Sequence, residues 1–175
     1  PGPEDAQAMV AYHTRNRDHL AHSGPLREDA FFTLEAWRQR VAEHQRQAVA
    51  GESAIFGLWR RGDAHGAVMG SVGLTQIVRG PAQRCSLGYG LDAEAEGQGY
   101  MTEALRAVIA HAFETMKLHR VEASYVPTNA RSGRVLRRLG FTVEGVARDY
   151  FCLNGKWQDH ILTALINPAD QAPVG

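Results

Sequence analysis

Residues 88–105 read GYGLDAEAEGQGYMTEAL, a glycine-containing strand that passes through a Gly97-Gln98-Gly99 turn into a helix. Glycines in such a turn permit positive φ angles and let successive amide groups point inward. The first amides of a helix have no partner within the helix and lie at the positive end of its dipole. A diphosphate fits such a site well. This stretch therefore predicts a strand–turn–helix unit with an anion site in its backbone.

Two other phosphate-binding motifs do not fit this turn. A nucleotide P-loop needs Gly-Lys-Ser/Thr at the helix start, whereas Tyr100 and Met101 follow the last glycine. A dinucleotide-binding fingerprint needs a third glycine or alanine where Thr102 stands, together with a parallel βαβ unit. The strand before the turn instead closes an antiparallel meander, so both motifs are excluded.

A second strand–turn–helix unit follows the first. Alternating apolar residues over 121–125 predict the strand, and Asn129 and Ser132 introduce a short helix over 131–139. Asparagine is a common helix cap, so capping is the default explanation of Asn129. Ser132 is less easily explained as a cap, and its hydroxyl is a candidate hydrogen-bond donor to a group in the cleft. The two helix starts are expected to converge.

The remaining segments predict a mixed sheet with helices on its faces, in a single domain over 1–167 with a tail over 168–175. Short turns connect the first three strands, as in an antiparallel meander, and Asn154-Gly155 indicates a two-residue hairpin. The expected helices are 3–20, 33–50, 100–117 and 131–139, and the expected strands are 53–60, 67–79, 84–92, 121–125, 141–153 and 156–166.

Composition limits the possible partners. Lys and Arg together number 19 of the 175 residues, as do Asp and Glu, so no basic excess attracts nucleic acid or an anionic membrane. No apolar run approaches the length that spans a bilayer. Cys85 and Cys152 lack CxxC spacing and are expected to be reduced thiols of a cytoplasmic protein. His19 and His22 have no third ligand nearby in the sequence, so no metal is expected.

The glycines of the strand over 85–92 allow two interpretations. Alternate residues from Cys85 to Leu91 are apolar, and Gly88 and Gly90 lie on the other face. Glycine weakens a strand unless something approaches its backbone closely. That neighbour is either a helix packed on the bare glycines or an extended ligand that lies along the strand end.

From 53 to 166 the chain resembles the GNAT superfamily of acyl-CoA-dependent N-acetyltransferases. It is particularly similar to the ribosomal-protein-alanine N-acetyltransferases that modify protein S5, the RimJ/RimL-like type. The matching segments are GQGYMTEAL (97–105), HR (119–120), NARS (129–132), LGF (139–141), EG (144–145), DY (149–150), NGKWQDH (154–160) and LTAL (162–165). The resemblance implies an α/β fold of the GNAT type. Its sheet would have six to seven mostly antiparallel strands, a parallel pair at the cofactor cleft and four flanking helices.

The resemblance also implies an acetyl-CoA site. The strand end near Leu91 would bind the pantetheine arm, Asn129 would contact the cofactor, and Ser132 would protonate the departing thiol. Two positions depart from the superfamily: Glu94 stands where Arg or Gln often opens the glycine motif, and Leu136 where many relatives carry a tyrosine acid. The pyrophosphate would be held by the backbone amides of Gly97, Gln98, Gly99, Tyr100, Met101 and Thr102.

The general base is less evident. Candidates are Glu103, Asp149 and Tyr150, with Asp159-His160 as a polar pair. Glu103 is also explained by the dipole of its helix, and the others by ordinary polar positions on a strand or hairpin. An α-amine needs only a mild base, since its pKa of about 7.7–8.0 is well below the 10.4 of lysine.

The expected reaction is therefore acetyl transfer by direct attack in a ternary complex, by a monomer or a homodimer. The expected acceptor is the α-amine of a protein N-terminus, and the N-terminal alanine of a ribosomal protein is one candidate. Two alternatives remain. The acceptor is a small amine such as an antibiotic, polyamine or amino acid, or the protein is a non-catalytic acyl-CoA sensor.

Overall fold

The computed structural model of the chain describes residues 1–22, 24–63 and 66–170. The helices are α1 (Ala6–Arg15), α2 (Arg17–Ala21), α3 (Leu34–Ala50), α4 (Tyr100–Ala110) and α5 (Ala130–Arg138). Short 3-10 turns are η1 (Pro3–Asp5), η2 (Asp29–Phe32) and η3 (Ala93–Ala95), and α4 continues into a π-turn, η4 (His111–Thr115). The strands are β1 (Ala54–Leu58), β2 (Gly70–Val78), β3 (Arg84–Leu91), β4 (Arg120–Tyr125), β5 (Thr142–Leu153) and β6 (Lys156–Ile166).

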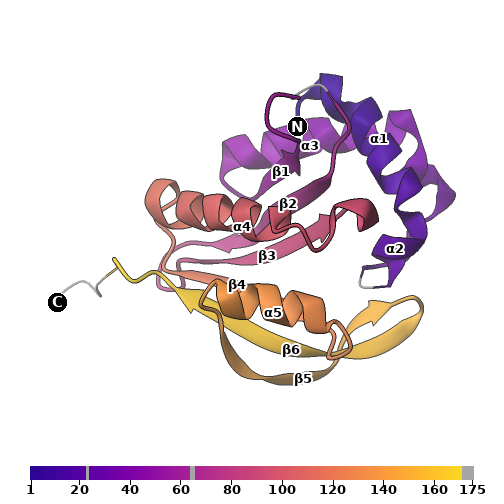
Figure 1. The fold of residues 1–175 in the computed structure, drawn as a ribbon. Coiled ribbons are helices and arrows are strands. Elements are labelled where there is room, and N and C mark those ends of the chain that lie inside the picture. The colour runs from indigo at the N-terminus through magenta and orange to yellow at the C-terminus, as the bar shows by residue number, and fades with distance from the viewer. Residues whose placement is uncertain (23, 64–65, 171–175) are drawn as a thin grey trace.

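The six strands form one mixed sheet in the order β1-β2-β3-β4-β6-β5. Every neighbouring pair is antiparallel except β3 and β4, which run parallel. Figure 1 shows α4 and α5 in front of the sheet, with α1 and α3 gathered at its β1–β2 end. The α/β fold class, the meander and the single parallel pair are therefore confirmed.

The predicted first helix is wrong in one respect, because it is broken between α1 and α2 at Asn16. The buried Asn16 side chain donates from Nδ2 to the carbonyl of Tyr12 at 3.0 Å and accepts from the amide of Ala93 at 3.1 Å. Asparagine side chains that bind backbone groups compete with helical hydrogen bonds. The break thus follows from a contact with η3, which is remote in sequence.

Other boundaries differ less. The second strand begins at Gly70 instead of 67, and the loop predicted over 22–32 contains η2, with residue 23 outside the described residues. Of the predicted tail, 168–170 are described, and Asp170 contacts the His119 ring at 2.8 Å. Residues 171–175 lie outside the described residues.

Two hydrophobic clusters hold the helices in place. The larger one packs α4 and α5 on the sheet, with Leu105, Val121 and Leu136 almost fully buried. The smaller one joins α1 and α3 around Tyr12 and Trp37. The larger cluster therefore fixes α4 and α5 on the sheet, and the smaller one fixes α1 against α3.

His13 of α1 makes the stability of the second cluster dependent on pH. Its ring stacks on Trp37 with centroids 4.7 Å apart and meets Phe31 edge-on at 5.1 Å. Burial, aided by the positive charges of Arg27 and Arg40, lowers the pKa of His13 to about 4. In the unfolded chain a histidine has a pKa of about 6.5, so between these values the unfolded state binds the proton more tightly.

We therefore expect His13 to lower the free energy of unfolding as pH falls from about 6.5 towards 4. The difference of pKa corresponds to about 2 kcal/mol at pH 5. Urea unfolding of the wild type and of His13→Gln at pH 7 and pH 5 measures this contribution, and the variant should lose less stability on acidification. An equal loss in both proteins would contradict the assignment.

Candidate active site

The parallel strands β3 and β4 are paired at only one end. Their register runs from Arg84–Arg120 to Ser86–Glu122, and β3 has no partner on β4 beyond that point. The two strands thus separate towards their carboxyl ends, beyond which ligands bind in open α/β sheets. The opening between β3 and β4 therefore lies where α4 and α5 start.

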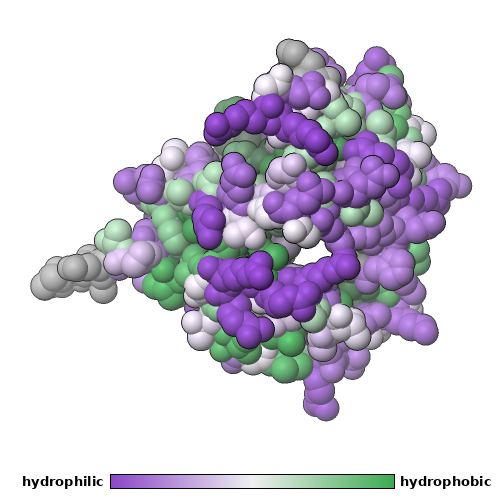
Figure 2. Space-filling model, in the orientation of Figure 1, coloured by the Kyte–Doolittle hydropathy of each residue, from purple (hydrophilic) through white to green (hydrophobic). Residues whose placement is uncertain are grey.

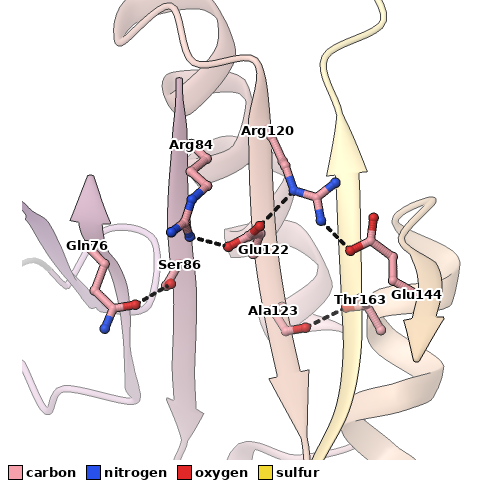
Figure 3. A network of polar contacts seen from close by, with 8 residues as sticks. All are labelled: Gln76, Arg84, Ser86, Arg120, Glu122, Ala123, Glu144 and Thr163. Atoms are coloured by element: carbon pink, nitrogen blue, oxygen red, sulfur yellow. Dashed lines mark hydrogen bonds and ion pairs between the residues drawn. The ribbon is translucent and has the colours of Figure 1, made fainter. Parts of the chain in front are cut away.

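A polar network holds the closed end of these strands together (Figure 3). Arg84 Nη1 donates to Glu122 Oε2 at 2.5 Å, and Arg120 Nε donates to Glu122 Oε1 at 2.8 Å. Arg120 also pairs with Glu144 of β5, and its two carboxylate partners hold the pKa of its guanidinium above the usual range. This network ties β3, β4 and β5 together, so the opening is restricted to the other end.

A cleft of about 550 Å³ occupies this opening. Figure 2 shows a deep opening at the centre of the face, bordered by hydrophilic residues. The cleft extends from the β3–β4 opening to α1, α2 and η2. Its lining includes Tyr12 and His13 of α1, Gly88, Tyr89 and Gly90 of β3, Ser124 and Tyr125 of β4, Asn129 and Ser132 at α5, and His160 of β6.

Three of these residues bring hydroxyl groups to the β3–β4 opening. Ser132 Oγ lies 2.7 Å from Tyr89 Oη, so one hydroxyl donates to the other. Tyr125 lies beside them, because a Cβ added at Gly133 would meet its hydroxyl at 2.8 Å. Burial raises the pKa of Tyr89 to about 12, so its phenol is protonated at neutral pH. The opening thus contains a pair of hydrogen-bonded proton donors.

Asn129 and Ser132 lie where the sequence predicts. Asn129 Oδ1 accepts from the amide of Ser132 at 3.0 Å, which confirms the predicted cap. Tyr89 was not predicted as a site residue, because its position in the alternation of β3 indicates an apolar side chain. Leu136, which stands where many relatives have tyrosine, is buried in the core at 1% exposure. The tyrosine hydroxyl that contacts Ser132 belongs to Tyr89 of β3.

The glycine turn is open and leads into an uncapped helix. Gly97 and Gly99 have φ values of 76° and 86°, and an added Cβ at either would meet nothing within 4 Å. No side chain caps α4, so the first-turn amides of Tyr100, Met101 and Thr102 have no side-chain partner. Leu91 and the turn lie outside the lining of the main cleft.

Glu96 connects this turn to the neighbouring helices. It pairs with Arg131 in the first turn of α5, and its Oε1 lies 3.4 Å from Nε2 of His19 in α2. The starts of α4 and α5 are therefore held next to each other, as the sequence predicts.

Of the two interpretations of the β3 glycines, helix packing applies to Gly90, and space for a ligand is found at Gly88. A Cβ at Gly90 would lie 3.1 Å from Leu20 Cδ2 and 3.2 Å from Tyr12 Oη, so helices pack closely on this residue. A Cβ at Gly88 would meet nothing within 4 Å, and Gly88 lines the cleft. Only Gly88 leaves space beside the strand for a ligand.

The three predicted base candidates do not line this cleft. Glu103 is exposed in the first turn of α4. Asp149 and Tyr150 lie in an irregular part of β5, where the Asp149 amide donates to Asp159 Oδ1 at 3.0 Å. Among the described residues no hydrogen bond or ion pair joins Asp159 to His160, and His160 lines the cleft. Their catalytic roles stay predictions.

The sequence matches the family model described as "Acetyltransferase (GNAT) domain" over residues 1–142. The chain belongs to the GNAT acetyltransferase family. It is 40% identical over 167 residues to the probable N-acetyltransferase YjcK of Bacillus subtilis (strain 168), covering 95% of this chain and 91% of that protein. It is 36% identical over 164 residues to the ribosomal protein uS5-alanine N-acetyltransferase of Escherichia coli (strain K12), covering 94% and 84%.

Solved structures of GNAT enzymes agree with this assignment. A ribosomal-protein-S5-alanine acetyltransferase from Vibrio fischeri has a TM-score of 0.93 at 37% identity, covering 98% of this chain and 93% of that chain. Mycobacterium smegmatis RimJ, solved in complex with CoA-disulfide, has a TM-score of 0.88 at 25% identity, covering 95% and 79%. This GNAT protein is thus an N-acetyltransferase whose relatives include ribosomal-protein acetyltransferases.

Three further features of this GNAT enzyme bear on the predictions. Cys85 is buried and Cys152 is exposed, and both are free thiols, as expected. Within 1–22, 24–63 and 66–170, no group of three or more His, Cys, Asp or Glu side chains is placed to hold a metal ion. The helices of these same segments include none with the length and hydrophobicity needed to cross a bilayer.

Proposed function

We propose that the protein transfers an acetyl group from acetyl-CoA to the α-amine of a protein N-terminus by direct attack in a ternary complex. The observation that carries this proposal is the Tyr89–Ser132 hydroxyl pair at the point where β3 and β4 separate. Acyl transfer from a thioester to an amine needs a proton for the departing sulfur, and this pair can give one. A cytoplasmic location follows from a ribosomal-protein acceptor.

The residues present fit acetyl-CoA. Positive φ angles at Gly97 and Gly99 and the uncapped start of α4 supply amides for a pyrophosphate. The backbone of β3 from 87 to Leu91, which lacks a partner on β4, offers hydrogen bonds to an extended amide-containing arm. Asn129 at the start of α5 would contact the same ligand. The bound co-substrate would supply an acetyl group activated as a thioester.

The protein's own groups would then complete the reaction. Ser132 Oγ–H would donate a proton to the departing sulfur, and Tyr89 Oη–H would restore the proton on Ser132. The uS5-alanine specificity of the E. coli relative supports an N-terminal alanine of a ribosomal protein as the acceptor. The acceptor would approach from the α1–η2 side of the cleft, opposite the glycine turn.

A direct test compares an alanine-starting peptide with its N-terminally blocked form and with free amines, each with acetyl-CoA. We expect a mass increase of one acetyl group on the free peptide and none on the blocked one. Mass spectrometry is suited to this assay because the exposed Cys152 would react with thiol reagents. Turnover of free amines alone would show a small-molecule enzyme, and no turnover with any amine would indicate a sensor.

A further inference from the structure

His160 of β6 is a buried imidazole with no role in the steps described above, which include no proton acceptor for the amine. Its exposure is 5%, and it lines the cleft together with Ser132 and Tyr125. Of the side chains that line the cleft, those with a lone pair that could serve as a base are His13, Asp18 and His160. Asp18 is exposed on α2, so only the two histidines are enclosed.

Both histidine rings pack on aromatic side chains, and His13 also lies near two arginines. Burial and the charges of Arg27 and Arg40 lower the pKa of His13 to about 4, so its neutral ring is a weak base. The ring of His160 is surrounded by aromatic side chains: the centroid of Tyr150 lies 5.7 Å away and that of Phe151 5.0 Å away. Because His13 is a weak base and Asp18 is exposed, His160 is the remaining candidate among the lining side chains.

One hydrogen bond determines which nitrogen of His160 is basic. Its Nδ1 lies 3.1 Å from the carbonyl oxygen of Gln158. A carbonyl oxygen can only accept, so Nδ1 carries the hydrogen of the neutral ring and Nε2 has the free lone pair. The structure thus supplies both a fixed tautomer and a fixed ring orientation.

A bulge in the neighbouring strand holds this arrangement. Ala147 pairs with His160 and Phe151 with Gln158, so residues 148–150 of β5 oppose the single residue Asp159 of β6. Asp149 adopts a positive φ of 48°, and its amide bonds to Asp159. Bulges of this kind re-aim side chains beside active sites. Here the bulge brings Tyr150 and Phe151 onto the ring of His160.

We propose that Nε2 of His160 is the general base that accepts the proton of the acceptor amine. This inference rests on the proposed function. The ammonium form of the acceptor gives one proton to His160, and the neutral amine nitrogen then forms its bond to the carbonyl carbon. As the carbon–sulfur bond breaks, the nitrogen releases a second proton to water. The sulfur takes a proton from the Ser132–Tyr89 pair. Return of the proton from His160 through water to that pair restores the enzyme.

The test uses His160→Gln, with His119→Gln as a matched control at a half-buried histidine outside the cleft. At pH 7 we expect kcat with the alanine-starting peptide to fall about 100-fold in His160→Gln and to be unchanged in the control. CoA affinity, measured by calorimetry, should be the same in all three proteins. His160→Ala should regain activity when imidazole is added.

The pH profile separates a base from a structural residue. The titratable groups around the ring are Tyr150 of β5, Tyr125 of β4, and Asp149 and Asp159 in the bulge. As pH rises past about 8 the acceptor amine loses its own proton, so the defect of His160→Gln should shrink. A defect that is the same at every pH, or an unchanged kcat, would overturn the proposal.

A readout that does not depend on turnover is the tautomer. Spectra of the protein labelled with ¹⁵N-histidine should show His160 protonated on Nδ1, and protonation on Nε2 would contradict the assigned role. If the wild type acetylates no amine at all, the proposed function fails and this inference with it. If the wild type turns over and His160→Gln equals it, only the inference fails.

Discussion

Replacement of Ser132 by alanine is expected to lower kcat by about 100-fold while the affinity for CoA stays the same. Ser132 Oγ lies 2.7 Å from Tyr89 Oη in the β3–β4 opening, and general acid catalysis contributes about 10²–10⁴ to rate. Because the pKa of Tyr89 is raised to about 12, its phenol keeps its proton below that pH. The Tyr89 phenol should therefore remain able to give a proton at every pH at which the enzyme is usually assayed.

The Tyr89→Phe variant and the double variant identify which hydroxyl gives the proton. If the two act as one relay, the double variant should be about as slow as Ser132→Ala alone, because effects within a unit are not additive. Ser86→Ala is a matched control on the same strand, since its hydroxyl contacts Gln76 outside the cleft. Unchanged turnover in Ser132→Ala together with a large loss in Tyr89→Phe would make Tyr89 the acid.

Replacement of Thr102 by aspartate is expected to weaken CoA binding by about 100-fold without loss of stability. Thr102 lies in the first turn of α4, which has no side-chain cap. A carboxylate near a helix start interacts favourably with the dipole, by about 0.3–1 kcal/mol, so the variant should fold well. The same carboxylate would repel a pyrophosphate and compete for its amides, and like charges in contact cost several kcal/mol.

Calorimetric titration with CoA measures the affinity, and thermal unfolding measures stability. Gln45→Glu, at an exposed position of α3, adds the same negative charge away from the turn and should leave CoA affinity unchanged. Equal affinity in Thr102→Asp and the wild type would show that the phosphates bind elsewhere. A similar loss in both variants would point to net charge as the cause.

The structure lies close to the sequence prediction wherever the signal is local. The alternation over 121–125, the Asn154-Gly155 hairpin and the apolar stripe of α4 each report the geometry of neighbouring residues. Prediction was weakest at Asn16 and in β5. Asn16 breaks a helix because its side chain accepts a hydrogen bond from the amide of Ala93, and the bulge at Asp149 depends on Asp159 of the next strand.

The amino-acid sequence by itself determined the order of strands and helices, the glycine turn before α4 and the Asn129 cap of α5. These features depend on φ preferences, periodicity and capping, which act over a few residues. Only the tertiary structure decided that Tyr89 meets Ser132, 43 residues away, and that His160 rather than Glu103 faces the cleft. Such contacts depend on strand pairing and on where β3 and β4 separate, so no local pattern records them.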